Sequence, residues 1–144
     1  MVRDFKTLVR LNDWEVDQKR RVLAEQLRQL ENLIGLLQNL EDEVAREQAH
    51  AATAPTEGGI FYGAYAEQAI LRRENYQSRI AEQEREVAAA REVLRLAFLE
   101  FKKFEISEER RVARADAELA REEQLDLDEI GITGFNRKRR DNER

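Results

Sequence analysis

Histidine is the first residue to consider for chemistry, because it is the side chain that most readily changes protonation near neutral pH. His50 is the only histidine in the 144 residues, and the chain has no cysteine. A general base needs an orienting partner and a cleft, and no second histidine or cysteine is present to bind a metal together with His50. We therefore interpret His50 as a solvated side chain just before a turn and predict no metal site.

Two other patterns fall short of a catalytic site. Gly58-Gly59 lacks the lysine and hydroxyl residues of a phosphate-binding loop. The adjacent carboxylates Glu122-Glu123 would need burial to acquire a useful pKa, and a structure of two helices seldom provides it. We expect no catalytic residue, no cofactor and no enzymatic activity.

A basic cluster lies near the end of the sequence. It comprises Arg137, Lys138, Arg139 and Arg140, followed by Asp141 and Glu143. Such a cluster can touch nucleic acid or an anionic membrane, and nucleic-acid binding would weaken steeply with added salt. The net charge of −5 and the neighbouring acids argue against this. We interpret the cluster as a solvated helix end and expect no nucleic-acid partner.

The composition indicates which elements must carry these residues. Charged residues make up 38% of the chain, aromatic residues 7%, and there is one proline. Such a chain has too few large apolar side chains for a thick core, yet its 42% hydrophobic content is too high for plain disorder. Long helices that each bury one narrow stripe resolve this tension. The absence of cysteine and of a membrane-length apolar run leads us to expect a cytoplasmic protein.

The apolar spacing predicts two helices, over residues 4–52 and 61–128. The expected coiled-coil seam of the first comprises Val16, Leu23, Leu27, Leu30, Ile34, Leu37 and Val44, with a second stripe at Leu33, Leu36 and Leu40. The expected seam of the second comprises Tyr76, Ile80, Gln83, Val87, Ala90, Leu94, Ala97, Phe101 and Phe104.

The segment 53–60 interrupts both patterns with Pro55, Gly58 and Gly59. We interpret it as the tip of a hairpin, and residues 129–144, with Gly131 and Gly134, as a flexible tail. The predicted fold is all-α: one domain formed by a long two-helix antiparallel coiled-coil hairpin, monomeric in isolation. A scaffold that homodimerises is the alternative, and its mass would depend on concentration.

Aromatic residues gather just after the predicted tip, at Phe61, Tyr62 and Tyr65. One interpretation is a small cap over the turn. The other is a docking patch, because exposed aromatic side chains are preferred anchors for protein partners. The sequence favours neither.

Several segments resemble the flagellar export protein family FliJ. They are Phe5 to Arg10 (FKTLVR), 15–25 (EVDQKRRVLAE), 91–97 (REVLRLA), 102–105 (KKFE), 108–111 (EERR) and 123–129 (EQLDLDE), with Arg137 behind them. The resemblance extends over nearly the whole chain in order and spacing. It implies an antiparallel coiled coil similar to the stalk of rotary ATPases, acting in flagellum biogenesis, and hence in motility and chemotaxis.

The resemblance also implies partners. The hexameric flagellar export ATPase would contact the end bearing both termini, through Phe5, Leu8, Asp128, Glu129 and Arg137. The export gate protein or the export chaperones would contact Phe61, Tyr62 and Tyr65. The protein would lie peripherally at the cytoplasmic face of the inner membrane. The equivalent stalk of a virulence type III secretion system, or a generic coiled-coil adaptor, would share this architecture.

Overall fold

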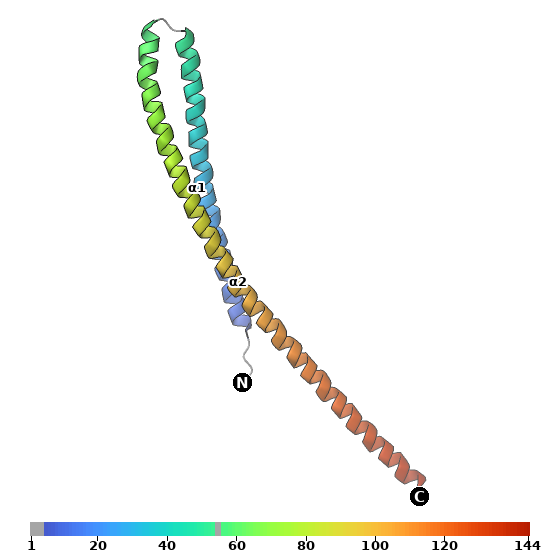
Figure 1. Ribbon diagram of the computed structural model, residues 1–144. Coiled ribbons are helices and arrows are strands. Elements are labelled where there is room, and N and C mark those ends of the chain that lie inside the picture. The colour runs from blue at the N-terminus through green and yellow to red at the C-terminus, as the bar shows by residue number, and fades with distance from the viewer. Residues whose placement is uncertain (1–4, 54–55) are drawn as a thin grey trace. The chain divides into compact units, whose positions relative to one another are not determined.

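Two long helices make up the structure. The computed structural model describes residues 5–53 and 56–144, without the side chains of residues 56 and 57. Helix α1 comprises Lys6–Thr53 and helix α2 comprises Thr56–Asn142, and the described residues include no strand. The helices pack against each other as a hairpin (Figure 1), so the predicted all-α hairpin is confirmed.

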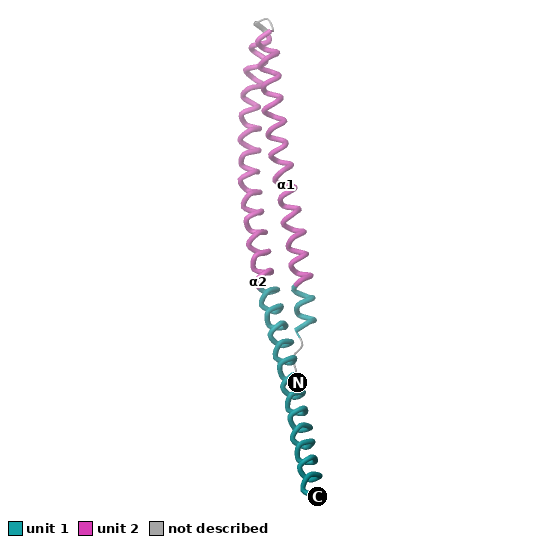
Figure 2. The backbone as a smooth tube through the Cα atoms, turned by 90° about the vertical axis from the view of Figure 1, so that its right-hand side faces the viewer, with its two compact units in different colours: residues 1–12, 100–144 teal, residues 13–99 magenta. Residues whose placement is uncertain are grey.

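Residues 13–99 form one of two compact units (Figure 2, magenta). In this unit α1 and α2 run antiparallel, and each buries a stripe at alternating three- and four-residue steps. The most buried side chains come from both helices: Val16, Leu33 and Leu40 from α1, and Ala69, Val87 and Ala90 from α2. The alanines on α2 leave room for the larger side chains of α1, which lets the two helices approach closely.

The seam of α1 differs in part from its prediction. Val16, Leu23, Leu30, Leu37 and Val44 are buried or half-buried as expected. Leu27 and Ile34 are exposed. The alternate seam positions, which lie between Leu23, Leu30, Leu37 and Val44, are occupied by Gln26, Leu33 and Leu40. The prediction followed apolar residues, and the polar Gln26 concealed the true heptad. On α2 every predicted seam residue from Tyr76 to Ala97 is buried or half-buried, which confirms that stripe.

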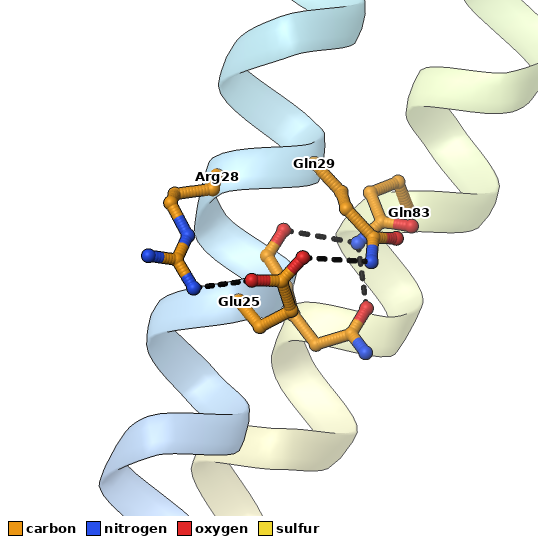
Figure 3. A network of polar contacts seen from close by, with 5 residues as sticks. Glu25, Arg28, Gln29 and Gln83 are labelled. Atoms are coloured by element: carbon orange, nitrogen blue, oxygen red, sulfur yellow. Dashed lines mark hydrogen bonds and ion pairs between the residues drawn. The ribbon is translucent and has the colours of Figure 1, made fainter.

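A glutamine pair explains why a polar residue occupies the seam. The side-chain amide of Gln83 on α2 donates to the backbone oxygen of Gln26 at 2.9 Å and to its side-chain oxygen at 2.7 Å. Figure 3 shows Gln83 reaching across to α1, where the neighbouring Glu25 accepts hydrogen bonds from Arg28 and Gln29. A hydrogen-bonded polar pair in a seam is satisfied in one alignment only, so it fixes the register of the two helices.

Ion pairs fix the alignment again, nearer the turn. The guanidinium of Arg73 donates two hydrogen bonds to the Glu41 carboxylate, at 2.5 and 2.9 Å. Arg72 donates to Glu43 at 2.8 Å. Each pair joins α2 to α1, and the fork of an arginine on a carboxylate is geometrically specific.

Helix α2 is longer at both ends than predicted. It begins at Thr56, so residues 56–60, predicted as part of the tip, are helical, whereas residues 54–55 lie outside the described residues. It continues to Asn142, so the predicted flexible tail 129–144 is wrong over 129–142. Glycine costs about 1 kcal/mol in a helix and does not remove a backbone donor as proline does. The cost of Gly131 and Gly134 therefore weakens the helix without ending it. The expectation of a single domain stays a prediction.

The other compact unit comprises residues 1–12 and 100–144 (Figure 2, teal). Within it, Phe5 and the first residues of α1 lie beside the beginning of the α2 portion. Among the described residues of this unit, no second helix lies alongside the rest of that portion. Every residue from 112 to 144 is exposed. We call residues 112–142 the terminal segment.

Candidate protein-binding sites

The predicted aromatic cluster lies on the first turns of α2. Phe61 is 77% exposed, and the rings of Tyr62 and Tyr65 lie 6.3 Å apart between centroids. A shallow groove runs between these aromatic side chains and the last turns of α1, lined on the α1 side by Glu47, His50 and Ala51. We call these three aromatic residues, with Glu47 and His50, the tip patch.

Tyr65 anchors the tip patch to the hairpin. Its hydroxyl oxygen is buried and has no hydrogen-bond partner among the described residues. Burial, together with the nearby Glu43 carboxylate, raises the pKa of Tyr65. Tyr65 therefore serves as a neutral packing residue. Phe61, by contrast, has most of its surface free for another molecule. The tip patch therefore combines a tyrosine packed against the hairpin with an exposed phenylalanine ring.

The N-terminal end of α1 is held by a second small cluster. The Phe5 ring lies 6.4 Å from the Phe104 ring, and the Phe5 backbone N–H donates to Glu108 at 3.0 Å. The Glu108 side chain is 13% exposed and also accepts two hydrogen bonds from Arg111, at 3.0 and 2.7 Å. The hydrogen bonds from Arg111 and from Phe5 lower the pKa of Glu108 to about 2. A charged Glu108 therefore closes the first turn of α1.

This cluster predicts an acid-labile N-terminal turn. The pKa of Glu108 is depressed in the folded state, so its stabilising contribution is present above the ordinary carboxyl value of 4.5 and is lost as the pH falls through about 2. The Phe5 amide resonance, followed by NMR, should shift with a midpoint near 2. A Glu108→Gln variant should lack this step. A midpoint near 4.5 in the parent chain would contradict the assignment.

The terminal segment presents apolar side chains on two sides. At 3.6 residues per turn, Leu125, Asp128, Ile132 and Phe135 share one side, which we call the Leu125 face. Leu119, Glu123, Leu127, Ile130, Gly134 and Arg137 share the opposite side, the Ile130 face. The large apolar residues of both faces are at least half exposed. Contiguous exposed apolar surface of this kind is typical of an interaction site.

The residues predicted to face the ATPase do not form one surface. Phe5 and Leu8 lie in the first turns of α1, where Phe5 contacts Phe104 and its backbone binds Glu108. Asp128 stands 20 residues beyond Glu108, about 30 Å further along α2. Glu129 and Arg137 lie on the terminal segment with it, all exposed. Contact of these residues with the ATPase stays a prediction. Two of them belong to the N-terminal end of α1 and three to the terminal segment.

Sequence reasoning missed several residues of these surfaces. Glu47 is brought to the tip patch by the antiparallel return of the chain, and no local pattern marks it. His50, interpreted as a solvated histidine, lines the same groove. On the terminal segment, Leu125 and Leu127 fell within the predicted helix 61–128 but outside its predicted seam, and Ile132 fell in the segment that Gly131 and Gly134 suggested to be a tail. The seven-residue step from Leu125 to Ile132 and the three-residue steps from Leu127 to Ile130 and from Ile132 to Phe135 were the signal that would have found them.

Neither helix contains a stretch long and apolar enough to cross a membrane, within the residues that the structure describes. The same residues include no group of three or more histidines and carboxylates placed to hold a metal ion.

Comparison with known proteins identifies the family. The chain matches the family model described as flagellar FliJ protein over residues 1–140. No curated protein and no solved structure gave a significant match. The family match spans the hairpin, the tip patch and nearly all of the terminal segment, in agreement with the resemblance of the sequence segments. The chain therefore belongs to the FliJ family of flagellar proteins.

Proposed function

We propose that this protein is a stalk-like component that links the flagellar export ATPase to the export gate and the substrate chaperones. Membership of the FliJ family implies a component of the flagellar export apparatus, a structural role and not an enzymatic one. The finer proposal assigns the terminal segment to the hexameric ATPase and the tip patch to the gate or the chaperones. The protein acts in the cytoplasm, peripherally at the inner membrane.

The observation that carries the proposal is the terminal segment with its two unpartnered apolar faces. A helix that docks on a flat surface needs one apolar face. A helix enclosed by a ring of subunits is contacted from several sides, and apolar residues on opposite sides suit such surroundings. The Leu125 face also includes Asp128, one of the residues assigned to the ATPase by resemblance.

The tip patch supports the second contact. Aromatic side chains that are rigid and exposed serve as anchors in protein interfaces. Phe61 meets both conditions, since it lies on a helix and most of its surface is free. Glu47 at the groove gives the patch a negative charge toward its partner.

ATP hydrolysis by the cognate export ATPase tests the first contact. We expect the protein to stimulate hydrolysis and an Ile132→Asp/Phe135→Asp variant to lose at least tenfold in apparent affinity, because two exposed apolar contacts are replaced by charges. Both residues are exposed, so the fold should be unaffected. Leu71→Asp, on an exposed site of the hairpin, is the matched control and should stimulate normally.

Absence of binding and of stimulation by the parent chain would overturn the ATPase contact and leave a coiled-coil adaptor. Activity on the ATPase of a virulence secretion system, and none on the flagellar one, would assign the stalk to that system instead.

A further inference from the structure

The charge along the terminal segment is strongly divided. Residues 116–129 carry seven carboxylates and one arginine: Asp116, Glu118, Glu122, Glu123, Asp126, Asp128, Glu129 and Arg121. Residues 137–140 are all basic. Between the two blocks lie Ile130, Ile132 and Phe135, all exposed. Two such helices in parallel would set acid against acid, whereas two in antiparallel would set each acidic block against a basic one.

The Ile130 face has the symmetry that an antiparallel pair requires. Glu123 and Arg137 stand seven residues before and after Ile130, and seven residues are close to two helical turns. All three side chains therefore lie on one side of the helix. A two-fold axis at Ile130 sets Glu123 of one copy opposite Arg137 of the other, on both sides of the axis.

The side chains of this face are available. Ile130 is 68% exposed, and Leu127 and Leu119 are more than half exposed. No ion pair within the described part of the chain involves Glu123 or Arg137, whereas the neighbouring Arg139 pairs with Glu143. Gly134 on the same face has no side chain, and no atom outside its own helical surroundings lies within 4 Å of the position that a Cβ would take. A second helix can therefore approach closely there.

We propose that the terminal segments of two copies of this protein associate as an antiparallel helix pair centred on Ile130. Leu127 and Ile130 form the apolar centre of the interface, and Glu123 and Arg137 form an ion pair on each side. The hairpin seam buries its own apolar stripe within the chain, so the terminal segment is where a second copy binds. The proposal does not rest on the ATPase contact. That contact would use both apolar faces of the terminal segment, so the ATPase ring and a second copy would compete for the Ile130 face.

Charge reversal tests the register. Sedimentation of the full chain over a wide concentration range should show a reversible dimer. Glu123→Arg and Arg137→Glu should each weaken the dimer about tenfold, because two attractive exposed pairs become repulsive. Mixing the two single variants should restore association as a heterodimer, since every pair across the axis is then of opposite charge. Charge reversal at Glu31, on an exposed part of the hairpin, is the matched control and should leave the dimer unchanged.

Two outcomes would overturn the proposal. One is a parent chain that stays monomeric at every concentration. The other is that both single variants associate weakly and the Glu123→Arg/Arg137→Glu double variant associates normally, while the mixture of the two single variants does not. That pattern would indicate that the charges pair within one chain.

Disulfide trapping gives an independent test, because the chain has no cysteine of its own. Ile130→Cys should form a covalent dimer readily on mild oxidation, since the two-fold axis brings both copies of this position together. Leu125→Cys, on the opposite face, should cross-link at least tenfold more slowly. Equal rates for the two variants would contradict the two-fold axis at Ile130.

Discussion

Replacing Leu40 by alanine is expected to lower the free energy of unfolding by about 2 to 3 kcal/mol. Leu40 is 2% exposed, the most deeply buried large side chain of the hairpin. Truncation removes its apolar contacts with α2 and leaves a cavity that two rigid helices close only in part. The value lies at the lower end of the usual range, because a seam between two helices surrounds a side chain less completely than a globular core does.

Urea unfolding followed by circular dichroism at 222 nm measures this change. Leu71→Ala is the control, because Leu71 is 66% exposed on α2, and its effect should stay within about 0.5 kcal/mol. Equal effects at the two positions would mean that the hairpin is not packed as described. Ile34→Ala, at an apolar site outside the seam, should resemble the control.

The second large effect is expected at the tip patch. A Phe61→Ala/Tyr62→Ala variant should bind the export gate protein at least 30-fold more weakly, the equivalent of about 2 kcal/mol for a lost aromatic anchor. Phe61 contributes little to the fold, since it is largely exposed, and Tyr65 stays to cover the turn. Titration calorimetry with the gate protein measures the dissociation constant, and the export chaperones can be tested in the same way.

An Ile70→Ala/Leu71→Ala variant, which truncates two exposed apolar side chains further along α2, is the control. It should bind normally. Both variants should retain their helix content. Normal binding and normal swimming by the Phe61→Ala/Tyr62→Ala variant would leave the aromatic cluster as a cap over the turn, the other interpretation of these residues.

Much of the fold follows from apolar spacing. The α2 seam was predictable because its polar member, Gln83, falls in register between Ile80 and Val87. On α1 the same rule selected Leu27 over Gln26, since spacing alone does not reveal that Gln26 pairs with Gln83. That information lies 57 residues away in the sequence. Helix ends were less predictable, because a glycine costs a helix about 1 kcal/mol without necessarily ending it.

The same distinction between local patterns and long-range contacts applies to the candidate sites. Phe61, Tyr62 and Tyr65 were recognisable because an aromatic cluster beside a turn is a local feature. Glu47 joins them through the antiparallel return of α1, which no local pattern contains. Phe5 and Asp128 were grouped because both lie toward chain ends, whereas the long continuation of α2 separates them. Sequence order did not indicate how far α2 continues beyond the N-terminal cluster.

The hairpin connectivity also sets the order in which contacts form during folding. The pair Arg72–Glu43 closes a loop of 29 residues, Gln83–Gln26 one of 57, and Phe5–Glu108 one of 103. Because the entropy cost of closure grows with the logarithm of loop length, closing the longest loop directly costs about 1 kcal/mol more than closing the shortest. We therefore expect the helices to pair first beside the turn and then progressively toward the N-terminal end of α1. Phe5 is expected to dock last and, on transient opening, to detach first.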